Sequence, residues 1–217
     1  MPNINCFDVE ISKNHRDIGN FLKATQGEFT DFFGIQAPMP SCFLIDSRKQ
    51  FDEIWGKKTE DWQVAWVSDN NIFILKPEKF LEESSHNNQD NFWKILKHEY
   101  SHIYYRKLSG GINKPKWLNE GLAKYLAGQK AEEISLEDAL DVTELHDDPG
   151  ANKMIFPVGL FWVRFLLKNF GKDRMLHLIM GLKGNPSKKH FCDEFRKIYD
   201  FEFNKKELWN KIKGLTD

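Results

Sequence analysis

The stretch "ILKHEYSHIYY", from Ile95 to Tyr105, holds two histidines four residues apart, with Glu99 directly after the first. On a helix this spacing puts His98 and His102 one turn apart on the same face, so both imidazoles can reach one metal ion. Glu99 is rotated by about 100° around the axis, where it can touch a water on that ion without taking a histidine's place. The spacing therefore predicts a metal site with a carboxylate base beside it. Two hydrogen-bonded histidines on an amphipathic helix remain the alternative reading.

A zinc hydrolase usually has three protein ligands and leaves the fourth position to water, so the pattern needs a third ligand. Glu120, in "WLNEGLAKY" (117–125), is separated from His102 by seventeen residues. That length lets the first helix end at the "SGG" of residues 109–111 and a second helix return alongside it, with small Ala123 and Ala127 permitting a close approach. A glutamate among leucines is also costly to bury uncompensated, and a metal ion removes that cost.

The two motifs "HEYSH" and "WLNEGLAKY" together resemble the gluzincin clan of zinc peptidases, and most closely its small peptidase-MA-like branch, whose catalytic domains are similar to thermolysin. "VAWVSDNNIFIL" (64–75) sits where such proteins place an edge strand and hairpin, and "GLFWVRFLLKNFG" (159–171) resembles the helix behind their site. The resemblance spans Ser41 to Lys213 and is strongest from Trp93 to Ala127. It implies one catalytic Zn²⁺ held by His98, His102 and Glu120, with Glu99 as general base in peptide-bond hydrolysis.

Two positions depart from the family pattern. Phe156 stands where many relatives carry a tyrosine that could stabilise the oxyanion, and Lys124 stands one turn after Glu120, where thermolysin-like relatives carry an aspartate. A donor for the oxyanion must then come from elsewhere, and His146 in "ELHDDPG" (144–150) is the first candidate, ahead of a tyrosine. Candidates for an acceptor that orients the ligand histidines are Asn119, Asp141 and Asp147.

Two other hypotheses stay open beside the peptidase. One is a catalytically inactive zinc-binding module of the same fold that binds peptides, which the missing tyrosine keeps alive. The other is a helical interaction domain with a fortuitous motif. An extended peptide or protein substrate would need a partner for its backbone amides, and by resemblance to thermolysin-like enzymes the edge strand Gln63–Val67 would supply it, with Ala65 and Trp66 at the substrate.

The pattern of elements predicts an α+β fold in a single catalytic domain over residues 1–217. An N-terminal lobe of about residues 1–108 would hold a small mixed β-sheet, helices and the zinc-binding helix, and a mostly helical lobe of about 109–217 would follow, with a cleft where the two lobes meet. Period-2 or compact apolar runs predict strands at "FDVEI" (7–11), "CFLID" (42–46) and the hairpin "QVAWVSDNNIFILK" (63–76), with Ile72–Leu75 central. Helical spacing predicts helices over 17–33, the two motif segments, 136–145, 158–170, 173–182, 187–199 and 204–213.

Composition excludes some classes of partner. The net charge of −1 and a pI near 6.7 give no electrostatic footprint for nucleic acid or an anionic membrane surface. The three cysteines are odd in number and widely spaced, so we expect reduced core thiols at Cys6, Cys42 and Cys192. No leader or spanning segment is evident, and we expect a cytoplasmic protein. The sequence leaves the oligomeric state open.

Overall fold

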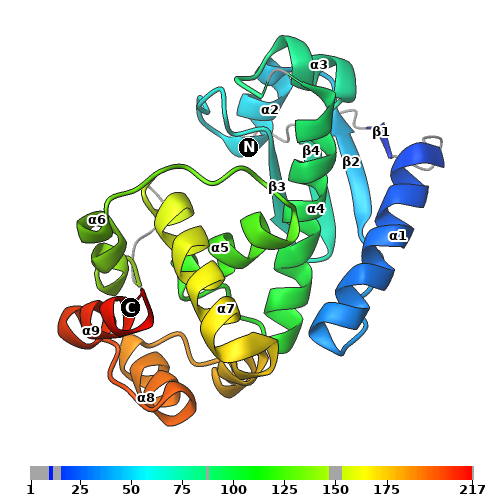
Figure 1. Cartoon of the computed structure of the whole chain (residues 1–217). Coiled ribbons are helices and arrows are strands. Elements are labelled where there is room, and N and C mark those ends of the chain that lie inside the picture. The colour runs from blue at the N-terminus through cyan, green and yellow to red at the C-terminus, as the bar shows by residue number, and fades with distance from the viewer. Residues whose placement is uncertain (1–9, 12–15, 87, 147–152, 217) are drawn as a thin grey trace, which may run out of the picture. The chain divides into compact units, whose positions relative to one another are not determined.

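A computed structural model describes residues 10–11, 16–86, 88–146 and 153–216 (Figure 1). It divides into two compact units, Met1–Ile103 and Tyr104–Asp217. The first unit combines a small sheet with helices and the second is helical, so the predicted α+β class is confirmed.

The sheet of the first unit has four strands in the order β1-β2-β4-β3. The β2–β4 pair is parallel, while β1–β2 and β3–β4 are antiparallel, so the sheet is mixed. The hairpin prediction is confirmed, with β4 in the interior of the sheet and β3 at its edge. The strands are β1 (Glu10–Ile11), β2 (Ser41–Ile45), β3 (Ala65–Ser68) and β4 (Asn71–Leu75).

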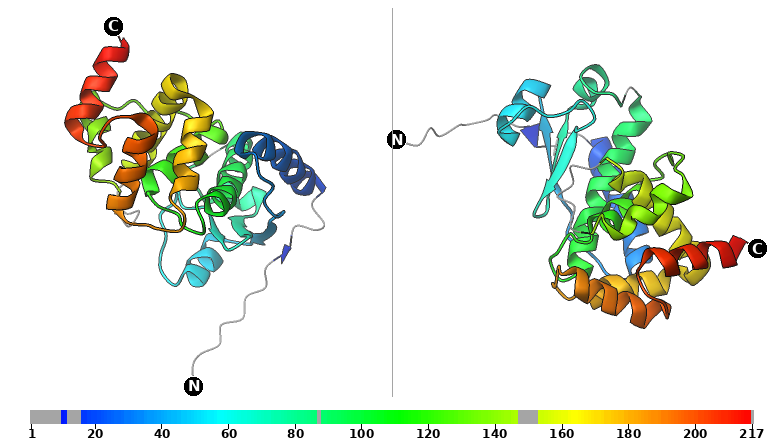
Figure 2. Two further views of the ribbon diagram at one scale, coloured as in Figure 1. Left: turned by 90° about the horizontal axis from the view of Figure 1, so that it is seen from below. Right: turned by 90° about the vertical axis from the view of Figure 1, so that its left-hand side faces the viewer.

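Alternation along the strands gives the sheet two different faces. One face is fully buried, and helices α1 (Arg16–Phe33) and α4 (Gln89–Leu108) lie on this side in Figures 1 and 2. Its side chains are at most 1% exposed: Cys42, Leu44, Ile72 and Ile74. The opposite face carries a row of half-buried rings, in which Phe73 stacks on Phe43 and on Trp66 with centroids 4.9 and 4.7 Å apart. Helix α2 (Arg48–Trp55) packs on that second face, because Phe51 contacts Trp66 edge to face at 4.9 Å.

Helix α4 is fixed within the first unit by its neighbours. Its Tyr100 ring lies 5.8 Å from Phe29 of α1, and its hydroxyl donates to the Pro38 carbonyl at 3.2 Å. Near its start, Phe92 contacts Phe80 of the short helix α3 (Pro77–Glu82) at 5.5 Å. Aromatic contacts of this kind hold a helix at a defined rotation, which decides where the motif side chains point.

The second unit packs helices around an aromatic cluster. Trp117 stacks parallel to Phe203 at 5.7 Å, and Phe191 contacts both Phe203 and Phe195. Gly171 (φ 83°) breaks the helical geometry inside α7, so the two helices predicted over 158–182 are present as two stretches of one element. The elements are α5 (Lys116–Leu126), α6 (Leu136–Leu140), the 3₁₀ turn η2 (Asp141–Thr143), α7 (Ile155–Gly181), α8 (Lys188–Tyr199) and α9 (Lys205–Thr216).

Helices α5 and α7 cross with their backbones in contact. A Cβ added at Gly121 would lie 2.3 Å from the carbonyl carbon and oxygen of Gly159, and one at Gly159 would lie 2.2 Å from the Trp117 carbonyl oxygen. Only hydrogen fits at these two positions, so the glycines set the separation of the helices. This contact was not foreseen from the sequence, and the prediction for Ala123 and Ala127, which concerns the approach of α5 to the histidine helix, stays a prediction.

Several predictions need correction. Helices α2 and α3 were missed, and the helix expected over 136–145 is shorter, since α6 gives way to a 3₁₀ turn at Asp141. Cys42 is a free, buried thiol as expected, whereas Cys192 is free but only partly buried. Cys6 and most of the predicted strand 7–11 lie outside the described residues.

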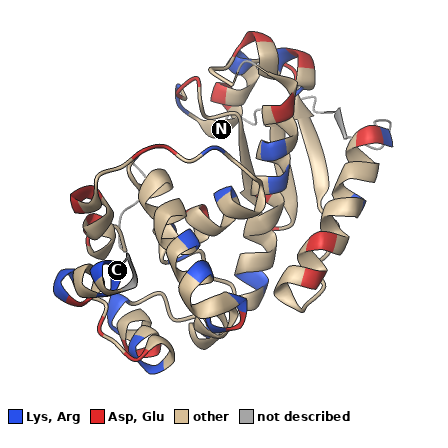
Figure 3. Cartoon of the chain, in the orientation of Figure 1, with Lys and Arg blue, Asp and Glu red and all other residues tan. Residues whose placement is uncertain are grey.

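The charges of the described elements fit the composition. Figure 3 shows positions of basic and acidic residues intermixed along the helices. Among the described residues, no helix combines the length and the apolar character needed to cross a membrane.

Candidate metal centre

The helix α4 runs without interruption through the histidine motif. Its first turn is capped by Asn88, whose Oδ1 accepts from the Asn91 amide at 2.9 Å, and Asp90 adds a negative charge there. Its end is closed by the Gly111 amide, which donates to the Arg106 carbonyl at 2.7 Å, with Gly110 and Gly111 at positive φ. The predicted stop at residues 109–111 is therefore confirmed.

On this helix the motif side chains converge. The rings of His98 and His102 lie with centroids 4.8 Å apart and nearly perpendicular, at 86°. One ligand atom from each of His98, Glu99 and His102 falls within 4.8 Å of the other two. That spacing lets a single cation contact both imidazoles, and Glu99 can lie at its side.

The surroundings of the histidines differ in exposure. His98 is 6% exposed, and the hydroxyl of buried Ser101 donates to its backbone carbonyl at 2.8 Å. His102 keeps partial exposure. Two imidazole nitrogens and a carboxylate are donors that suit Zn²⁺, and a half-open position beside a buried ligand suits a site that also admits water.

Glu120 lies on α5, in the second unit. It is partly exposed within a run of otherwise buried residues from Trp117 to Lys124. The histidines belong to the first unit, and the role of Glu120 as third ligand stays a prediction.

Lys124 and Phe156, the two residues that depart from the family pattern, lie near each other in the second unit. Lys124 is 8% exposed, pairs with Glu132 at 2.9 Å and lies 5.9 Å from the centre of the Phe156 ring. A cation that is buried must be paired, and Glu132 meets that need. Lys124 therefore has a place in the fold of the second unit that an aspartate would not fill.

The suggested orienting acceptors are engaged within the second unit. The side-chain Nδ2 of Asn119 donates to the Asn113 carbonyl at 3.4 Å, and Asp141 pairs with Lys205 at 2.9 Å. Asp147 lies outside the described residues. An acceptor role toward the histidines stays a prediction for all three.

His146 is buried in the second unit. The residue is 1% exposed, its ring lies 5.2 Å from the Phe191 ring, and its Nε2 lies 3.4 Å from the Pro186 carbonyl oxygen. These contacts are those of a packing residue. Its role as an oxyanion donor stays a prediction that its packing does not support.

On the edge strand β3, the pairing with β4 determines which backbone N–H and C=O groups point away from the sheet. The Leu75 amide donates to the Val64 carbonyl at 3.0 Å, and Ala65 lies opposite Ile74. Hydrogen-bonded and non-bonded pairs alternate along an antiparallel ladder, so Ala65 and Val67 direct their N–H and C=O groups away from β4, while Trp66 directs its own toward it. Within the described part of the chain no strand pairs beyond β3. Contact of Ala65 and Trp66 with a substrate stays a prediction.

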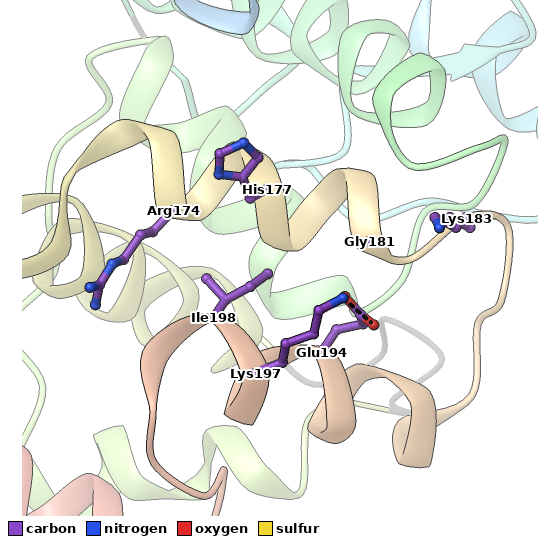
Figure 4. Close-up of a pocket in the computed structure, with 7 residues that line it drawn as sticks. All are labelled: Arg174, His177, Gly181, Lys183, Glu194, Lys197 and Ile198. Atoms are coloured by element: carbon purple, nitrogen blue, oxygen red, sulfur yellow. Dashed lines mark hydrogen bonds and ion pairs between the residues drawn. The ribbon is translucent and has the colours of Figure 1, made fainter.

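A pocket in the second unit contains none of the predicted site residues. It lies between α7 and α8, and Figure 4 shows that its side chains do not converge on one point: Arg174 and Lys183 lie at opposite ends. Lys197 pairs with Glu194 at 3.3 Å. The pocket is lined by Arg174, His177, Gly181, Lys183, Glu194, Lys197 and Ile198.

Comparison with known proteins finds a distant, partial similarity. No model of a protein family matches the chain. A curated protein described as a microbial collagenase, from Vibrio alginolyticus, is 29% identical over 150 residues. The chain is similar to a protease. The match covers 62% of this chain but only 18% of the collagenase, so the chain corresponds to a small part of that protein.

Proposed function

We propose that the protein is a zinc-dependent metallopeptidase that hydrolyses peptide bonds with Glu99 as its general base. The observation that carries the proposal is the convergence of ligand atoms from His98, Glu99 and His102 within 4.8 Å on one uninterrupted helix. The distant similarity to a collagenase supports the same class of activity.

Two histidines and one glutamate would hold the ion. His98 and His102 supply neutral imidazole nitrogens one helical turn apart, and Glu120 would supply the third ligand, leaving one position open. Bound Zn²⁺ would supply Lewis acidity, which lowers the pKa of a bound water to roughly 7 and polarises a carbonyl group.

Glu99 carries the proton. Its carboxylate sits one residue after the first ligand, close enough to accept a proton from the attacking water and then to deliver it to the departing amine nitrogen. The same side chain acts first as base and then as acid, so its removal should stop turnover without removing an imidazole ligand.

The edge strand β3 would hold the substrate in an extended form. The outward N–H and C=O groups of Ala65 and Val67 can pair with a peptide backbone by β-augmentation, and Trp66 would flank it. Main-chain pairing is largely blind to sequence, so side-chain pockets would set specificity. The name of the similar protein makes gelatin a suitable first substrate beside casein.

A second candidate is a zinc-binding, peptide-binding module without turnover. The observation that favours it is the replacement of the expected tyrosine by Phe156, which has no hydroxyl to donate to an oxyanion. In that case the ion would be retained and peptides would bind without being cut.

The experiment compares wild type with Glu99→Gln, using exposed Glu133→Gln as the matched control. Zinc is counted by mass spectrometry on protein purified without added metal, and cleavage of casein and gelatin is followed. We expect all three proteins to hold one zinc, and Glu99→Gln alone to lose about 10²-fold or more of the activity. Equal activity in all three would reject the proposal that the protein is a peptidase. Zinc binding without cleavage by wild type would favour the second candidate.

The third ligand is tested separately with Glu120→Ala. Because it removes one of three ligands, zinc affinity should fall by about tenfold or more, measured by competition with a chelator. An affinity equal to wild type would show that another residue completes the site.

A further inference from the structure

The turn that precedes the edge strand is fixed by one arginine. Arg48, the first residue of α2, donates from both terminal nitrogens of its guanidinium. The Nη1 atom donates to Thr59 Oγ1 and the Glu60 carbonyl, both at 3.2 Å, and to the Gln63 carbonyl. The Nη2 atom donates to the Asp61 carbonyl at 3.0 Å and to the Glu83 carbonyl, after α3, at 2.9 Å.

The rest of the turn is held just as closely. The Trp62 carbonyl lies 3.0 Å from His86 Nε2, so each of the four carbonyls from Glu60 to Gln63 has a hydrogen-bond partner. The Gln63 amide donates back to the Glu60 carbonyl at 3.0 Å. These bonds restrain the backbone of the turn, and with it the point at which the chain enters β3 after Val64.

Arg48 also sets where the open edge begins. Along the chain, Gln63, Ala65 and Val67 share one side, the side that faces away from β4. Arg48 occupies the carbonyl of Gln63, so the outward groups that stay open to a partner start at Ala65. Of the edge predicted over Gln63–Val67, only Ala65 and Val67 therefore have outward N–H and C=O groups that a peptide could pair with.

Helix α2 also contacts the strand β3 through aromatic side chains. Its Phe51 and Trp55 rings contact the Trp66 ring at 4.9 and 5.1 Å, and Trp66 stacks on Phe73. One short helix therefore holds both the main chain before β3 and the side chain in its middle.

We propose that Arg48 is a positioning residue for substrate, which clamps the Thr59–Gln63 turn and so presents Ala65 and Val67 as a rigid, two-residue template for an extended peptide. This rests on the proposed function of β3 as the peptide-binding edge. A clamped strand binds a peptide without first losing conformational freedom, whereas a loose strand must be ordered by the substrate.

The geometry needs arginine in particular. A planar fork with five donors can bond to acceptors on two sides at once, while a lysine ammonium is a single point with three donors. Burial lowers the pKa of Arg48, and the charges of Asp52, Glu83 and Asp61 oppose that change, so the guanidinium keeps its proton. Arg48→Lys therefore retains the charge and loses the fork.

The test compares Arg48→Lys with wild type and with Arg196→Lys, the same exchange at a surface ion pair to Glu202 on the second unit. Each is assayed on a blocked hexapeptide, long enough to pair with both Ala65 and Val67, and on a blocked dipeptide, which is not. For Arg48→Lys we expect KM for the hexapeptide to rise about fivefold to tenfold, the loss expected for one or two main-chain hydrogen bonds, with kcat within about twofold. The dipeptide and the control should behave as in wild type.

A purely structural role would give another pattern. Partial unfolding lowers the active fraction, so kcat would fall for both peptides with KM unchanged, and that result overturns the proposal, as does an unchanged KM. If wild type binds zinc but cuts neither peptide, the proposed hydrolysis has failed on its own. Hexapeptide affinity, measured by fluorescence anisotropy with and without Arg48→Lys, then decides the present proposal, and equal affinities or no binding would reject it.

Discussion

Replacing Gly121 by alanine tests whether the glycine contact between α5 and α7 supports the fold of the second unit. Gly121 follows Glu120 directly, and its missing side chain lets the backbone of α5 touch that of α7 at Gly159. An alanine Cβ would stand 2.3 Å from the Gly159 carbonyl group and 2.8 Å from its Cα. These are backbone atoms of a helix, so no side-chain rotation can relieve the overlap.

The size of the effect follows from two opposing terms. Relief of the overlap requires the helices to separate by roughly 1 Å, and overpacking of this kind costs about 3 kcal/mol, at the upper end for core insertions. Alanine is a better helix former than glycine by about 1 kcal/mol, which offsets part of the cost. The net loss of about 2 kcal/mol corresponds to a fall in Tm of about 4–8 °C for a chain of this size.

Thermal unfolding followed by circular dichroism measures this effect, with Gly27→Ala as the matched control. Gly27 is exposed in the middle of α1, and a Cβ there would meet nothing within 4 Å. The control should therefore gain about 0.5–1 kcal/mol from helix propensity and melt slightly above wild type. If Gly121→Ala also melts at or above the wild-type temperature, α5 and α7 are not in backbone contact at Gly121.

Two further effects concern stability. Burial raises the pKa of Asp52, but hydrogen bonds from the Thr59 side chain and amide, with the charges of Arg48 and Lys58, outweigh it and hold the pKa below its usual value. The stability that Asp52 provides is therefore present above about pH 4 and is lost as the pH falls through the folded-state pKa. Asp52→Asn lacks this carboxylate, so its Tm should drop less between pH 5 and pH 2 than the Tm of wild type. Equal drops in Tm would contradict this. Ser187 caps α8 by accepting from the His190 amide, so urea unfolding of Ser187→Ala should show a loss of about 1 kcal/mol, while Ser187→Asp should unfold like wild type; loss in both would argue against a cap.

Local patterns in the sequence predicted the larger elements well, because an amphipathic period needs no tertiary information. Helix α1 and the β3–β4 hairpin lie where their apolar spacing puts them. Helix α2 was missed, because eight residues hold too few apolar positions to show a period. Its end signals were present all the same: Ser47 caps its start and Gly56, in the left-handed region, closes it.

In the candidate site, too, local spacing predicted some features while others depend on tertiary packing. The convergence of His98, Glu99 and His102 follows from one helix, so their spacing alone predicted it. The third ligand depends on how a second helix is placed, and the sequence can only nominate Glu120. Gly121 costs helix propensity within α5, and only its contact with Gly159, far away in the sequence, explains why a glycine stands there.

The Arg48 clamp could not have been predicted from residue types, and the reason is physical. Four of the five acceptors that its guanidinium bonds are backbone carbonyls, which every residue possesses, so the identities of Glu60, Asp61 and Gln63 carry no trace of the contact. The proposed metal ligands are the opposite case, because their chemistry resides in side chains. Side chains proposed to perform chemistry can thus be nominated by motif, while an arginine that restrains a main chain through its carbonyls is found only from the fold.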